Sequence, residues 1–72
     1  MSISAIAAKE LANLGVDLEI TEDSGYSAIV LKELAKICST KGTKLTVHAN
    51  GYSAIVLKEV ASIGGGLVTI RI

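Results

Sequence analysis

The sequence predicts a two-layer α/β domain built from three helix–strand repeats (αβαβαβ). The expected sheet has three parallel strands in the order 1-2-3, with all helices on one face and a polar opposite face. Three observations lead to this fold. A nine-residue stretch occurs twice letter for letter, a degenerate third copy opens the chain, and each copy precedes a segment of alternating apolar and polar residues. Such a pattern is typical of a short solenoid.

The repeated stretch is GYSAIVLKE, at Gly25–Glu33 and again at Gly51–Glu59. The degenerate copy, SAIAAKELA at Ser4–Ala12, matches Ser27–Ala35 at seven of nine positions. We therefore expect a single domain, residues 1–72, whose repeats cover about 1–24, 25–50 and 51–72.

Each repeat is expected to begin with an amphipathic helix. Ser27 and Ser53 are suitable N-caps, because a serine hydroxyl can accept a hydrogen bond from an unpaired N–H of the first turn. Ser24 and Asn50 are rival caps about one turn earlier. Apolar residues recur at three- and four-residue steps, and glycines stand where a left-handed C-terminal cap belongs. The predicted helices are Ile3–Leu14, Ser27–Cys38 and Ser53–Ile63, with cap glycines Gly15, Gly42 and Gly64.

A strand with one apolar and one polar face should follow each helix. In VDLEIT, for example, the apolar residues alternate with acidic residues and threonine, and successive side chains of a strand face opposite sides of a sheet. Helices on both sides would make both faces apolar, so all helices should cover one face. Strands joined by helices should be parallel, with right-handed crossovers. The predicted strands are Val16–Thr21, Lys44–Ala49 and Leu67–Ile72.

Length and composition predict association of the chain with itself. A chain of 72 residues buries only about 60% of the surface that its unfolded form exposes. The single cysteine, Cys38, excludes an internal disulfide, and the single histidine, His48, argues against a structural zinc site. Half of the residues are hydrophobic. We therefore expect a homo-oligomer with no metal and no cofactor.

Two surfaces are candidates for the contact between copies. The isoleucine of each helix projects onto its solvent side, so a row of isoleucines would cross the helix layer. The third strand has one charge and no proline to protect its edge, and an unprotected apolar edge is a template for another strand. The expected interface residues are Ile6, Ile29, Ile55, Val68, Ile70 and Ile72.

The charge distribution argues against nucleic acid and membrane partners. The formal net charge is zero, so there is no basic excess to hold a phosphate backbone. Charge is nevertheless uneven, since residues 1–26 carry one lysine against five acidic residues (net −4), residues 27–52 are net +3 and residues 53–72 are net +1. No apolar run approaches the roughly 20 residues of a membrane span, and the N-terminus lacks the basic segment of a secretory signal. We expect a reducing, cytoplasmic setting.

A ligand site in this fold would lie beyond the carboxyl ends of the strands, where helix N-termini offer free N–H groups. In the predicted register, Thr21, His48 and Arg71 form one row on the polar face. Arg71 and His48 could hold a carboxylate or phosphate there, and Glu19 could orient the imidazole. The candidate ligand-binding residues are His48, Asn50, Gly51, Ser53 and Arg71.

Simpler roles explain the same residues. The loop residues are also what two capped helix entries require, and the strand residues are what a solvated sheet face with cross-strand pairs requires. Acidic residues in the first loop and the terminal carboxylate would repel an anion. We expect no catalytic residue, because Cys38 falls on an apolar helix face and one histidine completes no recognisable catalytic arrangement. The Gly64–Gly66 run lacks the Lys-Ser/Thr of a P-loop.

The leading hypothesis is therefore a non-enzymatic, self-associating α/β-repeat protein with an interaction or scaffolding role. The first alternative is a small module that binds an anion or nucleotide through the strand-end loops. The second is a designed repeat protein. Regular capping favours design, whereas the imperfect first copy, the unequal loops, Cys38 and His48 favour a natural gene.

Overall fold

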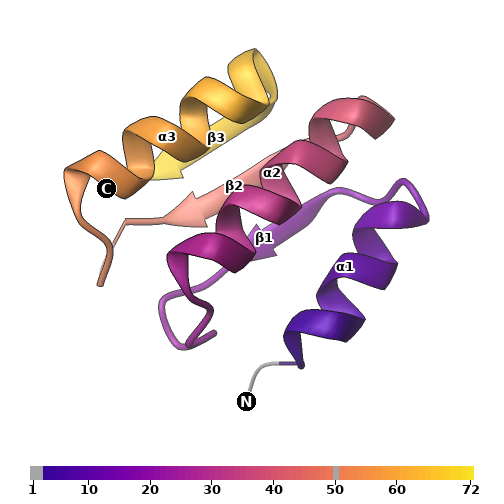
Figure 1. Ribbon diagram of the computed structural model, residues 1–72, viewed down its shortest axis with the longest axis horizontal. Helices are drawn as coiled ribbons and strands as arrows, with labels where there is room; N and C mark the ends of the chain where they lie inside the picture. The colour runs from indigo at the N-terminus through magenta and orange to yellow at the C-terminus, as the bar shows by residue number, and fades with distance from the viewer. Residues whose placement is uncertain (1–2, 50) are drawn as a thin grey trace.

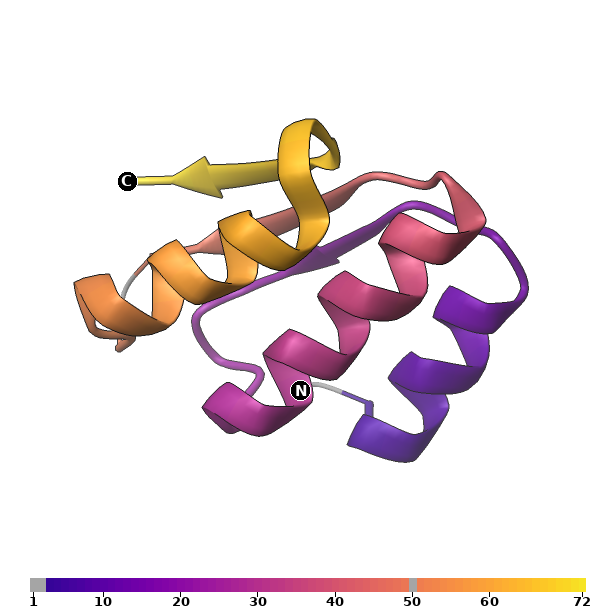
Figure 2. The same cartoon turned by 45° about the horizontal axis from the view of Figure 1, so that its top comes forward.

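The predicted fold class is confirmed by the computed structural model, which describes residues 3–49 and 51–72. Over these residues the chain has three α-helices and a parallel sheet in the order β1-β2-β3. The helices form one layer and the sheet the other (Figures 1 and 2). The elements are α1 (Ala5–Asn13), β1 (Leu18–Ile20), α2 (Ala28–Lys41), β2 (Leu45–His48), α3 (Ala54–Gly64), the 3-10 turn η1 (Gly65–Leu67) and β3 (Val68–Arg71).

The strand register agrees with the predicted rows of the polar face. Glu19 lies opposite Thr46, which lies opposite Thr69, and His48 lies opposite Arg71. The apolar residues of the strands form the alternate rows on the other face, towards the helices. The register is fixed because a slip of one residue would turn the apolar side chains of a strand into solvent.

The serine caps are also confirmed. The hydroxyls of Ser27 and Ser53 each accept a hydrogen bond from the N–H three residues later, at 3.3 Å. Ser4, which the predicted helix Ile3–Leu14 included, caps α1 in the same way at 3.2 Å. Ser24, the rival cap of α2, instead accepts from the N–H two residues later, at 3.4 Å, within the loop before the helix. The other rival, Asn50, lies outside the described residues.

One predicted glycine cap is wrong. Gly15 and Gly42 have the left-handed backbone expected after a helix, with φ of 85° and 75°. Gly64, however, is the last residue of α3, has a φ of −85° and is buried. The positive φ of 60° falls on Gly65. Gly64 instead lies within the helix and packs against β3. The Val68 side chain leaves no room there for a Cβ atom, so this position requires glycine.

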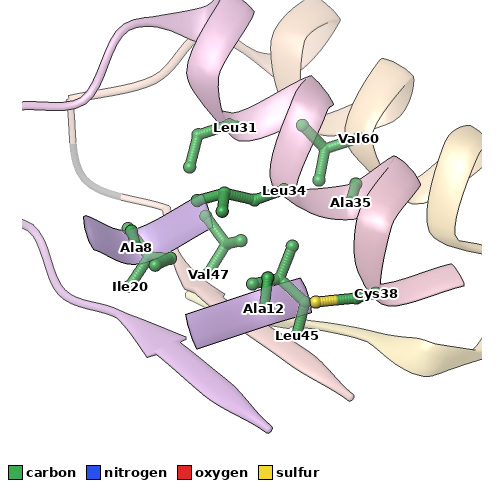
Figure 3. Close-up of a cluster of buried hydrophobic side chains, with 10 residues drawn as sticks. All are labelled: Ala8, Ala12, Ile20, Leu31, Leu34, Ala35, Cys38, Leu45, Val47 and Val60. Atoms are coloured by element: carbon green, nitrogen blue, oxygen red, sulfur yellow. The ribbon is translucent and has the colours of Figure 1, made fainter. Parts of the chain in front are cut away.

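The core is dominated by the central repeat (Figure 3). The end helices contribute small side chains from α1, and one valine and the backbone of Gly64 from α3. The central elements α2 and β2 contribute most of the large ones, since their leucines and the β2 valine have no exposed surface, and β1 adds Ile20. Burial of a leucine contributes about 1.5–3 kcal/mol, so α2 and β2 supply most of the stabilisation. The buried hydrophobic residues are Ala8, Ala12, Ile20, Leu31, Leu34, Ala35, Cys38, Leu45, Val47 and Val60.

The close approach of α3 to β3 gives a first prediction. A Cβ added at Gly64 would overlap Val68 Cγ2 and lie 3.4 Å from Val68 Cβ, and valine has little rotational freedom with which to move away. We expect Gly64→Ala to lower the free energy of unfolding by about 1–3 kcal/mol, as overpacking of a core does. Denaturant unfolding followed by circular dichroism measures this change.

Gly66→Ala is the matched control. A Cβ at Gly66 would have no neighbour within 4 Å, and Gly66 is not among the glycines with positive φ. That variant should be neutral or slightly more stable, since alanine reduces the freedom of the unfolded chain. Equal stability of the two variants would contradict the packing that we assign to Gly64.

Candidate functional site

Two ion pairs link neighbouring repeats in the same way. Lys9 Nζ lies 2.8 Å from Glu33 Oε1, and Lys32 Nζ lies 3.0 Å from Glu59 Oε1. In both, the lysine of one repeat meets the glutamate of the next repeat. Such exposed pairs contribute at most about 1 kcal/mol each, so their value here is geometric. They show which side of each helix faces the preceding helix and which faces the following one.

These pairs define two sides of the central helix. Residues three or four apart lie on the same side of a helix. Val30 and Ile37 therefore share the side of Glu33, which faces α1 and which we call the glutamate flank. The opposite side, the lysine flank, faces α3 and carries Lys32 with the small residues Ala28 and Ala35. Neighbouring helices thus pack a flank with large apolar side chains against a flank with alanines.

The glutamate flank of α1 has no helix beside it. It consists of Ala7, Glu10, Leu11 and Leu14, and with Ile3 these residues line a shallow groove at the surface. Leu14 is 78% exposed and Leu11 is 37% exposed, whereas Leu34, which corresponds to Leu11 in the repeat, is fully buried. Sequence analysis missed this surface. Alignment of the repeats could have found it, because no described helix precedes α1 to cover the side that the central helix buries.

The lysine flank of α3 is open in the same way. It consists of Ala54, Lys58 and Ala61, of which the first two are exposed and the third is half-buried. Ala35, which corresponds to Ala61, is fully buried beneath the neighbouring helix.

The apolar face of β3 is also incompletely covered. Val68 and Ile70 are half-buried and pack against the core, whereas their register partners Leu45 and Val47 are fully buried. The last residue, Ile72, is fully exposed. Of the three predicted interface residues in this strand, two are therefore core-facing side chains that lack a complete cover. Figure 1 places α1 and β3 at opposite ends of the layered stack.

The predicted row of isoleucines is exposed, as expected. Ile6, Ile29 and Ile55 are 72%, 70% and 70% exposed. The ion pairs between helices lie among them, since each isoleucine precedes the lysine and glutamate of its own repeat by three and four residues. The row is therefore a set of single apolar side chains among charged ones.

Two tyrosines form a second link between repeats that sequence analysis did not predict. The Tyr52 hydroxyl donates to the Tyr26 carbonyl at 2.8 Å, and the Tyr26 hydroxyl donates to the Ile3 carbonyl at 2.6 Å. Each tyrosine thus reaches the equivalent residue of the preceding repeat. The two bonds hold the helix starts in line across the layer.

The strand-end loop uses its polar groups internally. The Ser53 hydroxyl accepts from the Val56 N–H, and the Tyr52 N–H donates to the Ala49 carbonyl at 3.1 Å. Gly51 is exposed, with a φ of 88° that suits the turn. These contacts give Ser53 and Gly51 the roles of cap and turn, and the remaining loop candidate, Asn50, falls outside the described residues.

The polar sheet face brings three of the predicted side chains together. His48 Nε2 lies 2.6 Å from Glu19 Oε2, so the predicted contact between the carboxylate and the imidazole is present. Arg71 lies opposite His48 in the ladder. The hydrogen bond with His48 is the main cause that holds the pKa of Glu19 below its ordinary value of 4.5, and the charges of His48 and Arg71 add to it. The arrangement is a cross-strand pair of Glu19 and His48 with Arg71 beside the imidazole in the ladder.

This cluster gives a second prediction. His48→Ala should raise the pKa of Glu19 back towards 4.5, which carboxyl NMR titration measures. A carboxyl whose pKa is lowered by folding stabilises the fold above its ordinary value. That contribution is lost as the pH falls through the lower, folded value, and His48→Ala should reduce this pH dependence, since only the charge of Arg71 then lowers the pKa of Glu19.

Thr46→Ala is the control for this titration. It changes the residue opposite Glu19 in the ladder and leaves the imidazole in place. The same Glu19 pKa in wild type and His48→Ala would show that the imidazole does not act on the carboxylate.

Comparisons with known proteins add no relative. No protein-family model, no curated protein and no solved structure matches the chain.

Within residues 3–49 and 51–72, no group of three or more His, Cys, Asp and Glu side chains is placed to hold a metal ion. None of the helices in that part of the chain has the length and apolar character needed to cross a membrane. Cys38 is a buried free thiol in the core.

Proposed function

We propose that this protein is a non-enzymatic, self-associating α/β-repeat protein with an interaction or scaffolding role. One observation carries the proposal: the terminal repeats expose apolar side chains at positions that the central repeat buries. Leu11 is 37% exposed where Leu34 is fully buried, and Leu14 is 78% exposed where Ile37 is half-buried. A surface that repeats an internal contact and lacks its partner is suited to bind a copy of that partner.

The size of the chain supports association. Covering a leucine contributes about 1.5–3 kcal/mol, which is a large fraction of the 5–15 kcal/mol by which folded domains are typically stable. Binding to another copy stabilises the folded form by mass action. For a chain of 72 residues with one cysteine, this source of stability replaces the disulfides on which other small domains rely.

The isoleucine row supports association less well than the ends of the stack. Ile29 is flanked by Lys32 and Glu33, both of which are held in ion pairs with neighbouring helices. Burying the row would desolvate those charges, and single apolar residues on a surface are common.

Anion binding is the less supported candidate. His48 Nε2 is already engaged by a carboxylate, and the Ser53 hydroxyl and Tyr52 N–H serve the local turn and cap.

We also propose a reducing, cytoplasmic setting for the protein, since its single cysteine, Cys38, is a free thiol.

Light scattering coupled to size-exclusion chromatography tests the proposal. We expect a mass above the 7.4 kDa of one chain, rising with concentration because association follows mass action. A mass of one chain from micromolar to millimolar concentration would contradict self-association.

A third prediction separates the two candidate surfaces. Ile29→Ser removes the central apolar side chain of the row, which is 70% exposed and contributes little to the core. The variant should keep the stability of the wild type within about 0.5 kcal/mol and keep its mass. A fall to the mass of one chain in the same experiment would instead assign the interface to the row.

A further inference from the structure

We propose that copies of this chain associate head to tail. In this arrangement the lysine flank of α3 in one copy packs against the glutamate flank of α1 in the next, and β3 of the first copy extends the sheet to β1 of the second. The inference rests on the proposed self-association and specifies its partner, a second copy, and its geometry.

The contact repeats one that the chain already makes twice. Within the chain, the lysine flank of α1 meets the glutamate flank of α2, and the lysine flank of α2 meets the glutamate flank of α3, as the two ion pairs show. The sequence of α3 is identical to that of α2 from Ala28 to Glu33. The free flank of α3 therefore offers Ala54 and Lys58 where α2 offers Ala28 and Lys32 to its neighbour.

The two free flanks also match in size. The α1 side presents the exposed leucines Leu11 and Leu14, and the α3 side presents the small residues Ala54 and Ala61. Within the chain, Ala35 of the lysine flank of α2 is fully buried and lies close to α3, where a Cβ at Gly64 would be 3.9 Å from the Ala35 Cβ. Close packing of large side chains against small ones is the condition for helices to approach.

Charge favours this arrangement over a two-fold contact. Among the described residues, neither Glu10 nor Lys58 forms an ion pair, although each corresponds to a residue that does. Head-to-tail packing brings Lys58 of one copy to Glu10 of the next. A two-fold contact of α1 with α1 would instead join two acidic flanks, and one of α3 with α3 would join two basic ones, which like charges oppose.

The sheet edges are complementary in the same direction. β1 and β3 each pair on one side only, since they are the two ends of the order β1-β2-β3. Continuing the observed register places Thr69 beside Glu19 of the next copy, with Arg71 as its diagonal neighbour. Diagonal neighbours lie about 7–8 Å apart, within reach of a long side chain. Arg71 would then meet Glu19 of the next copy as His48 meets Glu19 within the chain.

The arrangement also covers the apolar face of β3. In the layer order, α1 of the next copy would lie beyond α3, over the junction between the two sheets. It would there cover Val68 and Ile70, which are half-buried in one chain, as the helix layer covers Leu45 and Val47. One internal contact is not repeated, because Ile3 has no hydroxyl to donate to the Tyr52 carbonyl of the preceding copy.

A head-to-tail contact leaves one free end on each side of every assembly. Growth therefore does not stop at a dimer unless rotation closes a ring. The twist of a parallel sheet rotates each successive copy relative to the last, so the stack should grow as an open, twisted assembly.

Two blocked variants test the geometry. Leu14→Glu places a carboxylate on the glutamate flank of α1 and blocks that end. The double variant Ala54→Glu/Lys58→Glu does the same to the lysine flank of α3. All three changed residues are exposed in the single chain, so each variant should fold, as circular dichroism will verify. Lys58→Glu alone is a milder second variant of the α3 end, and Ile29→Ser is the control.

We expect the wild type and Ile29→Ser to exceed the mass of a dimer and to grow with concentration in sedimentation velocity. Each blocked variant alone should be a single chain, because burying an unpaired carboxylate should weaken the contact by about tenfold or more. An equimolar mixture of the two blocked variants should form dimers and nothing larger, since it contains one intact end of each kind.

The possible negative results distinguish a failure of self-association from a failure of the head-to-tail contact. A wild type that stays a single chain would overturn self-association, and the head-to-tail contact with it. A wild type that associates while either blocked variant keeps its mass would leave self-association intact and overturn the head-to-tail contact. Blocked variants that stay single chains when mixed would also overturn it.

Discussion

Leu31, Leu34 and Cys38 of α2 pack against Leu45 and Val47 of β2, and all five are almost fully buried. The rest of the structure depends on this contact, because it holds most of the large buried side chains, to which the outer repeats add Ile20, Val60 and two alanines. A single helix–strand repeat cannot bury its own apolar surface, so it needs a neighbour on each side. Only the central repeat has both neighbours, and it alone reaches the burial expected of a large domain.

The polarity of the stack follows from where each large side chain lies. The glutamate flank carries valine, leucine or isoleucine, and the lysine flank carries alanine, which favours one order of neighbouring helices. The ion pairs and the tyrosine hydroxyl bonds run in that same order. Packing, charge and hydrogen bonding therefore agree, and such agreement between levels is what specifies one arrangement over its alternatives.

The fold could be predicted from the sequence because the repeat supplies its own alignment. The exact copies place Ser27 and Ser53 at equivalent helix starts, and alternation in each strand decides that the helices share one face. Two features could not be read in this way. The role of Gly64 depends on Val68, a contact between elements that local patterns do not contain. The exposure of Leu14 depends on its place in the first repeat, since the same position in the central repeat is half-buried.

Repeat proteins that remain monomeric usually end in capping repeats with a polar outer face. Neither α1 nor β3 presents such a polar outer face. α1 exposes Ile3, Leu11 and Leu14, and β3 ends the sheet with an apolar face that is only half-covered. Yet the two ends of the stack differ, since one is acidic with large side chains and the other is basic with small ones. Two equivalent exposed apolar ends would favour disordered aggregation. Ends that differ and are complementary favour assembly in one direction. For this reason we regard the exposed apolar side chains at the two ends of the stack as a property of the interface and not as a defect of the fold.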